Sequence, residues 1–251
     1  MSGHSKWANI KHKKAKTDAI KGRMFTKFAR EIIVAARAGG GDPNGNFRLK
    51  IAIENAKAAN LPNDNINRAI QKGAGDSEGA SYEELRYEGY GPGGVAVMVD
   101  LVTDSRNRTA AEMRHIFSKN GGNMGETGSV GWMFTEKGQL SLAKESLKLN
   151  EDELMLFVLE AGADDMEDQD ESYEIYTDSS AMQEVRQILL DGGIPIENAA
   201  VNLIPNNRVE VSDLEQAKKI IKLIDSLEGH DDVQKVYTNF DLAESLAEED
   251  L

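Results

Sequence analysis

The chain has 251 residues, no cysteine and a formal net charge of −14. The missing cysteine excludes disulfides, iron–sulfur clusters, cysteine-bound zinc and a catalytic thiolate. Hydrophobic residues make up 40% of the chain, which excludes wholesale disorder, and no apolar run reaches the ~18 residues of a membrane span. The length suggests two or three small domains.

The charge is distributed very unevenly along the chain. Residues 1–72 carry 15 lysine and arginine residues against 5 acids, a net of +10. Residues 73–251 carry 14 against 38, a net of −24. This asymmetry predicts a basic binding module joined to an acidic body, with any polyanionic partner bound by the first third of the chain.

The basic first third of the chain is predicted to be an arm followed by helices. Residues 1–16 have many lysines, no acid and weak periodicity. Thr17 and Asp18 are suitable caps for a helix that runs to about residue 38, where three glycines follow. Further helices are expected at 47–59 and from Pro62 to Gly73. The apolar stripe expected to face the core of the first helix is Ile20, Phe25, Phe28, Ile32 and Ala36.

A glycine-rich linker at 73–81 precedes a region of mixed structure. Strands are predicted at 83–88 and 94–102, joined by the turn GYGPGG, with a helix at 106–119. Short strands are predicted at 129–134 and 138–143.

Strands and helices then alternate to the end of the chain. We expect helices at 151–161, 180–191 and 213–227, and strands at 172–177, 196–204, 208–212 and 233–238. The acidic stretch 164–171 is expected to be a solvated loop, and the acidic tail from Asp241 is expected to fray.

Catalytic chemistry receives little support from the residues. GYGPGG formally matches a dinucleotide fingerprint, but an apolar strand follows it where a helix is needed, so a hairpin is favoured. His4, His12, His115 and His230 form no compact metal-binding motif. Asp100 and Asp104 lack an obvious third catalytic group, which favours strand-end and capping roles. The expectation is a non-enzyme without a catalytic residue, metal or cofactor.

Basic residues point instead to nucleic acid. Arg23, Lys27, Arg30 and Arg37 lie at i, i+4, i+7 and i+14, so they share one helical face. Trp7 suits stacking on a base or packing against the first helix, and the sequence leaves both open. The predicted nucleic-acid-binding residues are Lys6, Trp7, Lys11, His12, Lys13, Lys14, Lys16, Lys21, Arg23, Lys27, Arg30 and Arg37.

Several segments resemble the YebC/PmpR family. They are SGHSKWANIKHKKAKTDAIKGR (2–23), FTKFAREI (25–32), GGGDPNGNFRL (39–49), NLPNDNINRAIQKG (60–73) and the long segment 87–134 that begins YEGYGPGG. The resemblance implies an α+β fold of three domains, in which a helical N-terminal domain precedes two ferredoxin-like α/β domains, one inserted in the other. We place the helical domain at 1–76, the second domain at 77–134 and 206–251, and the insert at 135–205.

The same resemblance implies two biological roles. Family members are described as cytoplasmic DNA-binding transcriptional regulators, and the family also includes the mitochondrial translational activator of cytochrome c oxidase and members linked to ribosomes. The expected function is therefore a cytoplasmic nucleic-acid-binding regulator of gene expression, a DNA-binding transcriptional regulator in the first place. A ribosome- or RNA-associated translation factor is the alternative, and a protein-interaction scaffold is the third hypothesis. The expected partners are duplex DNA, ribosomal RNA or the ribosome, with no membrane or small-molecule substrate.

Overall fold

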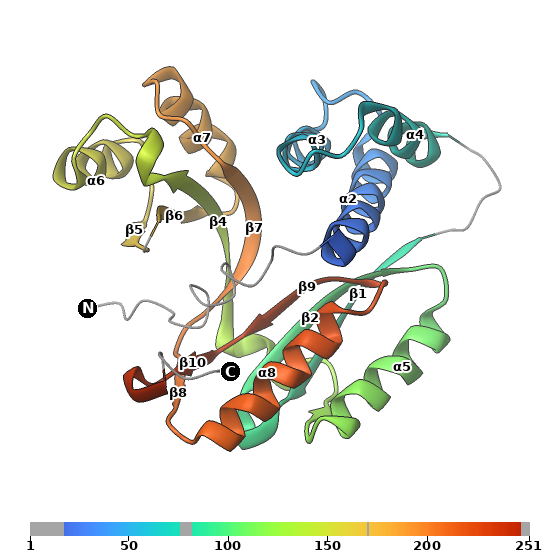
Figure 1. Cartoon of the computed structure of the whole chain (residues 1–251). Helices are drawn as coiled ribbons and strands as arrows, with labels where there is room; N and C mark the ends of the chain where they lie inside the picture. Colours follow the sequence, from blue (N-terminus) through green and yellow to red (C-terminus); the bar gives the residue numbers. More distant parts are fainter. Residues whose placement is uncertain (1–17, 76–81, 170, 247–251) are drawn as a thin grey trace. The chain divides into compact units, whose positions relative to one another are not determined.

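The computed structural model describes residues 18–75, 82–169 and 171–246, without the side chains of 18–21 and 244. These residues form two compact units (Figure 1). One unit is Thr135–Ile204, and the other combines the described residues before Thr135 with those from Pro205 onward. No helix in the described ranges has the length and apolar character needed to cross a membrane.

The second of these units begins with three helices, α2 (Asp18–Gly39), α3 (Phe47–Ala58) and α4 (Asn63–Ala74). They enclose a small hydrophobic core of their own. Ile32 and Ala36 of the predicted α2 stripe are buried, whereas Phe25 and Phe28 are partly buried against the same core. The residues that meet them from α3 and α4 are Leu49, Ala52, Ala56, Ile66 and Ala69.

One buried asparagine joins the end of α2 to the start of α3. The Asn46 Oδ1 accepts the Leu49 N–H at 3.1 Å and so caps α3. The Asn46 Nδ2 donates to the carbonyls of Ala35 (2.7 Å) and Gly40 (2.9 Å) at the end of α2. Because Asn46 lies so close, a Cβ on Gly39 would stand 2.7 Å from its amide nitrogen.

The α/β domain of this unit is built on a four-stranded sheet with the order β3-β1-β2-β9. Figure 1 shows α5 and α8 on the same face of this sheet, where Phe117 of α5 and Ile220 of α8 pack against Val97 and Val99 of β2. Strand β10 pairs in parallel with β8 in a separate two-stranded sheet. The bounds are β1 Glu83–Tyr90, β2 Ala96–Thr103, α5 Arg106–Lys119, β3 Asn123–Met124, β8 Val209–Val211, α8 Leu214–Glu228, β9 Val233–Thr238 and β10 Phe240–Leu242.

The GYGPGG segment is a hairpin turn, as predicted. Strands β1 and β2 are antiparallel, with Tyr87 opposite Val99. Between them lies the 3₁₀ turn η1 (Pro92–Gly94), in which Gly93 and Gly94 have φ of +73° and +77°. Only glycine adopts this backbone without strain, so the glycines serve the turn.

The unit Thr135–Ile204 has the strand and helix order of a ferredoxin-like domain. The chain runs β-α-β-β-α-β and the sheet order is β5-β6-β4-β7, with β6 antiparallel to both its neighbours. Leu140, Leu154, Ile175 and Leu189 are fully buried in it. The fold class predicted from the sequence is thereby confirmed. The bounds are β4 Phe134–Ala143, α6 Glu151–Glu160, β5 Asp165–Asp168, β6 Ser172–Asp178, α7 Met182–Asp191 and β7 Asn198–Pro205.

Two local predictions were wrong, and a third was wrong in part. The acidic stretch 164–171 contains strand β5, in which Met166 is buried between acids that remain accessible. The tail from Asp241 continues through β10, and Leu242 and Leu246 are buried in the core. Of the two strands predicted at 129–134 and 138–143, the second is confirmed as part of β4, whereas the first contains a 3₁₀ turn and only Phe134 of it belongs to β4. The 3₁₀ turns are η2 Gly131–Met133, η3 Lys144–Ser146 and η4 Glu244–Leu246.

Candidate nucleic-acid interface and an adjoining ion-pair network

Most of the predicted nucleic-acid-binding residues belong to the N-terminal arm. Lys21 lies in α2, and its side chain is not described. The assignment of these residues to phosphate therefore stays a prediction. Those outside the described residues are Lys6, Trp7, Lys11, His12, Lys13, Lys14 and Lys16.

The four basic residues of α2 have different surroundings. Arg23 and Arg37 are exposed, and Arg37 donates to the Tyr82 carbonyl at 3.4 Å. Lys27 Nζ donates to the Glu228 carbonyl at 2.8 Å, and Arg30 forms an ion pair with Asp232. Three of the four residues of the predicted stripe, Lys27, Arg30 and Arg37, thus make contacts within the chain, which the helical spacing alone did not show.

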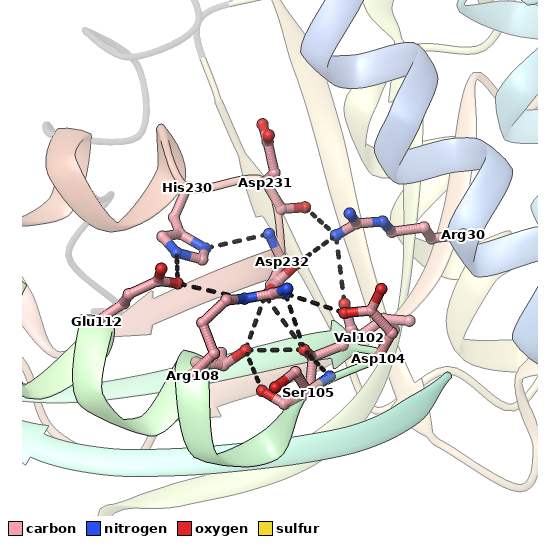
Figure 2. A network of polar contacts seen from close by, with 11 residues as sticks. Arg30, Val102, Asp104, Ser105, Arg108, Glu112, His230, Asp231 and Asp232 are labelled. Carbon is pink, nitrogen blue, oxygen red and sulfur yellow. Dashed lines mark hydrogen bonds and ion pairs between the residues drawn. The ribbon is translucent and has the colours of Figure 1, made fainter. Parts of the chain in front are cut away.

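Asp232 is the centre of the network drawn in Figure 2. It lies between α8 and β9, and its side chain is 4% exposed. Its Oδ1 accepts the Arg30 Nη1 at 2.9 Å, and its Oδ2 accepts Arg108 Nη2 at 2.8 Å. The Thr109 and Thr103 hydroxyls also donate to Oδ2, at 2.7 and 3.2 Å.

These contacts keep the Asp232 carboxylate ionised. Burial opposes its ionisation, but hydrogen bonds from Arg108 and Thr109 and the charges of Arg30 and Arg108 outweigh burial and lower the pKa to about 2. A buried carboxylate needs such partners because an unpaired buried charge is costly. Arg30 further donates to the carbonyls of Val102 (3.3 Å) and Asp231.

The network also brings His230 next to two carboxylates, a cluster that sequence reasoning missed. His230 and Asp232 meet Glu112, and ligand atoms of the three residues lie within 4.8 Å of one another. The His230 Nδ1 accepts the Asp232 N–H at 3.1 Å, and Nε2 lies 2.8 Å from Glu112 Oε2. Both ring nitrogens of His230 therefore have hydrogen-bond partners. Since two arginines also bond Asp232, this donor set does not fit a divalent cation.

Asp100 and Asp104 do not form a shared carboxylate site. Asp100 accepts Arg86 Nε at 2.6 Å and Nη2 at 3.0 Å, and it accepts the Tyr237 hydroxyl at 3.3 Å. Asp104 pairs with Arg108 at 3.1 Å. Each carboxylate is paired with an arginine, which leaves no geometry for joint acid–base work.

Charged residues also join the helical domain to the open face of the sheet. Arg48 forms a two-pronged ion pair with Glu84, 3.1 Å at the longer contact. Burial lowers the pKa of Lys235, although the charges of Glu31 and Asp100 oppose this. The helical core and the α/β core remain separate clusters. Polar interfaces of this kind depend more on ionic strength than hydrophobic ones do.

Further exposed cations of the helical domain lie on α3 and α4. They are accompanied by two exposed acids, Asp42 and Asp64. Two of these cations lie seven residues apart on α3 and the other two lie four residues apart on α4, so each pair shares one face of its helix. This spacing in the sequence could have identified both faces as basic. These residues, absent from the predicted set, are Lys50, Lys57, Arg68 and Lys72.

The arrangement defines a mixed helix-and-sheet protein in which a helical N-terminal domain precedes a region of two α/β domains. The family model of the TACO1/YebC N-terminal domain matches residues 5–76, and that of the TACO1/YebC second and third domain matches residues 82–240. The chain belongs to the TACO1/YebC family.

Known relatives cover the whole length of the chain. A protein of Desulfitobacterium hafniense named probable transcriptional regulatory protein is 69% identical over 251 residues, 100% of both chains. One of Halothermothrix orenii with the same name is 55% identical over 249 residues, 99% of this chain and 98% of its own. The crystal structure of the conserved hypothetical protein Aq1575 from Aquifex aeolicus is similar with a TM-score of 0.88 at 50% identity, over 96% of this chain and 98% of that one.

Proposed function

We propose that the protein is a non-enzymatic, cytoplasmic regulator of gene expression that binds duplex DNA as a transcriptional regulator. The observation that carries the proposal is that the first 72 residues have a net charge of +10, whereas the rest of the chain has −24. Relatives named probable transcriptional regulatory protein support the regulatory part of it.

The proposed binding track consists of the arm lysines and the exposed basic residues of the helical domain. Arg23, Arg37, Lys50, Lys57 and Arg68 are exposed, so a phosphate backbone has access to their side chains. Phosphate contacts of this kind supply affinity without sequence readout. Lys27 and Arg30 contribute to this track only if they give up their contacts with Glu228 and Asp232 and bind phosphate instead.

The acidic remainder limits where nucleic acid is bound. The unit Thr135–Ile204 carries 4 lysine and arginine residues against 17 acids, a net of −13. Such a surface repels phosphate, which directs nucleic acid to the basic domain.

The alternative function is that of a ribosome- or RNA-associated translation factor. It is favoured by the composition of the arm, where five lysines and Trp7 occur without an acid in residues 1–16. Aromatic and basic residues together suit unpaired bases and RNA backbone better than base edges in a duplex groove.

A competition experiment separates the two functions. Labelled full-length protein is bound to ribosomes at near-physiological salt, with duplex DNA added in large mass excess. We expect the DNA to remove the protein from the ribosome if it is a DNA-binding regulator. Ribosome binding that persists against DNA would replace the first function by the second.

A pair of triple variants shows whether the arm is the site. Reversing Lys11, Lys13 and Lys14 to glutamate is expected to abolish binding to either target and to leave the thermal unfolding midpoint nearly unchanged. The matched control reverses the exposed Lys218, Lys219 and Lys222 of α8, which changes the net charge equally. Binding that survives the arm reversal, or is lost equally in the control, would contradict an arm-centred site.

A further inference from the structure

Trp132 is an exposed aromatic residue that the proposed function does not yet use. Its side chain is 71% exposed, on the 3₁₀ turn η2 that precedes β4. Exposure of a whole indole forgoes a large hydrophobic gain. In the described part of its unit, the other exposed large hydrophobic residue is Met24, at 37%.

The loop that carries Trp132 is organised by a buried carboxylate. Glu88 is 7% exposed and accepts three backbone N–H groups, those of Gly128, Val130 and Gly131, each at 2.8 Å. Burial opposes ionisation of Glu88, but these hydrogen bonds outweigh it and lower the pKa. The carboxylate therefore fixes the backbone immediately before Trp132.

Three glycines let the loop follow this path. Gly128 has φ of +89°, and a Cβ on Gly125 would lie 2.5 Å from the Ser129 hydroxyl. A Cβ on Gly131 would lie 3.3 Å from the Glu88 carboxylate. The loop therefore has little room for side chains at these glycine positions, and its backbone is restricted to this conformation.

The indole itself is held by its polar edge. Its Nε1–H donates to the Ser129 carbonyl at 3.3 Å, and the Tyr90 hydroxyl donates to the same carbonyl at 2.9 Å. The Trp132 carbonyl accepts the Asn206 side-chain amide at 3.2 Å. Because the only polar atom of the indole already has a hydrogen-bond partner, a ligand contacts Trp132 through the faces of its ring.

We propose that Trp132 stacks on an unpaired base of a single-stranded nucleic acid. This inference rests on the nucleic-acid binding that both proposed functions share, and it concerns single-stranded segments, because bases within a duplex are paired. It adds a contact to a base, whereas the basic domain contacts phosphate, and it lies far in sequence from the basic arm. A ring with free faces on an ordered support binds any base by stacking, without hydrogen-bond readout.

The surroundings favour a base over a protein partner. Protein interfaces place tryptophan anchors within larger apolar areas that exclude water. Trp132 instead follows a glycine-rich loop and contacts the exposed Asn206. A solitary aromatic in polar surroundings fits one flat ligand better than an extended apolar surface.

Tryptophan fluorescence tests this directly, because the chain has only two tryptophans, Trp7 and Trp132. In the full-length Trp7→Phe variant, Trp132 is the sole reporter. Oligouridylate and oligothymidylate of about 12 nucleotides are the probes. We expect both to quench Trp132, and an abasic DNA strand of the same length, which keeps the phosphates, to leave its emission unchanged.

Affinity is measured separately by the anisotropy of the labelled oligouridylate. Trp132→Ala is expected to weaken binding about tenfold and Trp132→Phe, which keeps an aromatic ring, about threefold or less. The control Leu156→Ala removes another exposed apolar side chain and is expected to leave affinity unchanged.

The outcomes separate this inference from the proposed function. If the oligonucleotides bind but neither quench Trp132 nor respond to Trp132→Ala, the stacking assignment is overturned and nucleic-acid binding stands. Quenching by RNA alone or DNA alone supports stacking and identifies the strand. Loss of a protein contact in Trp132→Ala with unchanged oligonucleotide affinity overturns it in favour of a protein partner. If no nucleic acid binds the wild type, both proposals fail.

Discussion

Arg30 of α2 and Asp232 of the α8–β9 turn lie 202 positions apart in the sequence, with the guanidinium 2.9 Å from the carboxylate. This pair connects the basic helical domain to the α/β domain, and its carboxylate is also bonded by Arg108. A residue that helical spacing assigns to a phosphate-binding face therefore has a structural partner of its own.

A double-mutant cycle should show this pair to be strongly coupled. We expect Arg30→Met and Asp232→Asn each to lower the free energy of unfolding, with a coupling energy of about 1–3 kcal/mol because the pair is largely buried. Urea unfolding measures all four proteins. The Arg48–Glu84 pair, whose side chains are each nearly half exposed, is the control and should couple by less than about 1 kcal/mol. Equal coupling in both pairs would contradict the central role of Asp232.

The stabilisation from Asp232 should depend on pH. Its pKa is about 2 in the folded protein against 3.8 ordinarily, so the unfolded chain takes up its proton first as the pH falls. The contribution is complete above about pH 5 and is lost progressively toward pH 2; the shift corresponds to about 2 kcal/mol. Urea unfolding of wild type and Asp232→Asn at pH 7, 5, 4 and 3 checks this. The difference between the two proteins should shrink at the acid end, and a constant difference would refute the assignment.

Local sequence patterns predicted the elements well, for a physical reason. The stripe of α2 and the apolar run of β2 report burial, and burial fixes helices and strands. The wrong predictions also have a common cause. Asp165 and Glu167 flank Met166 in β5, and Asp241 lies between two buried apolar residues in β10, so the acids hid both strands. Their acidic composition therefore led to the prediction that both stretches are exposed to solvent.

The candidate site was less accessible to sequence reasoning. The Asp232 network joins residues of three separate elements to the α8–β9 turn: Arg30 of α2, Thr103 of β2, and Arg108 and Glu112 of α5. No spacing within one helix or strand predicts such a meeting. The support of Trp132 by Glu88 is of the same kind, since 42 positions separate Glu88 from Val130.

Gly73 should be required for the packing of α4 on α2. A Cβ there would lie 2.3 Å from the Ile33 carbonyl and 2.8 Å from the Ala36 side chain, and backbone does not yield easily. We expect Gly73→Ala to destabilise the helical domain by about 2 kcal/mol or more. Gly22 in α2 has open space at its Cβ position, so Gly22→Ala should be neutral or stabilising by up to about 1 kcal/mol. Circular dichroism during thermal unfolding measures the midpoints of the two variants. Similar midpoints would contradict the close contact at Gly73.

Loss of the Glu88 charge should loosen the loop that holds Trp132. Glu88→Gln keeps the shape but replaces one accepting oxygen by a donor that faces backbone N–H groups, at an expected cost of about 1–3 kcal/mol. In the Trp7→Phe background, the fluorescence anisotropy of Trp132 should fall. Glu84→Gln, which changes an exposed acid of the same strand, is the control. It should leave the free energy of unfolding and the anisotropy of Trp132 nearly unchanged. Unaltered Trp132 anisotropy in Glu88→Gln would show that the loop is ordered by other contacts.

Binding to nucleic acid should weaken with salt in proportion to the phosphates neutralised. With about six to eight phosphates contacted, the logarithm of the binding constant should fall with the logarithm of salt concentration at a slope of about −5 to −7 on duplex DNA. The slope on a single strand should be about a quarter shallower. Removing the charges of Lys11, Lys13 and Lys14 by substitution with glutamine should reduce the duplex slope by about 3, because each lost phosphate contact removes nearly one counterion. Glutamine at Lys218, Lys219 and Lys222 is the matched control, and the slope should be retained. A wild-type slope in the arm variant would move the phosphate contacts from the arm to the cations exposed on α3 and α4.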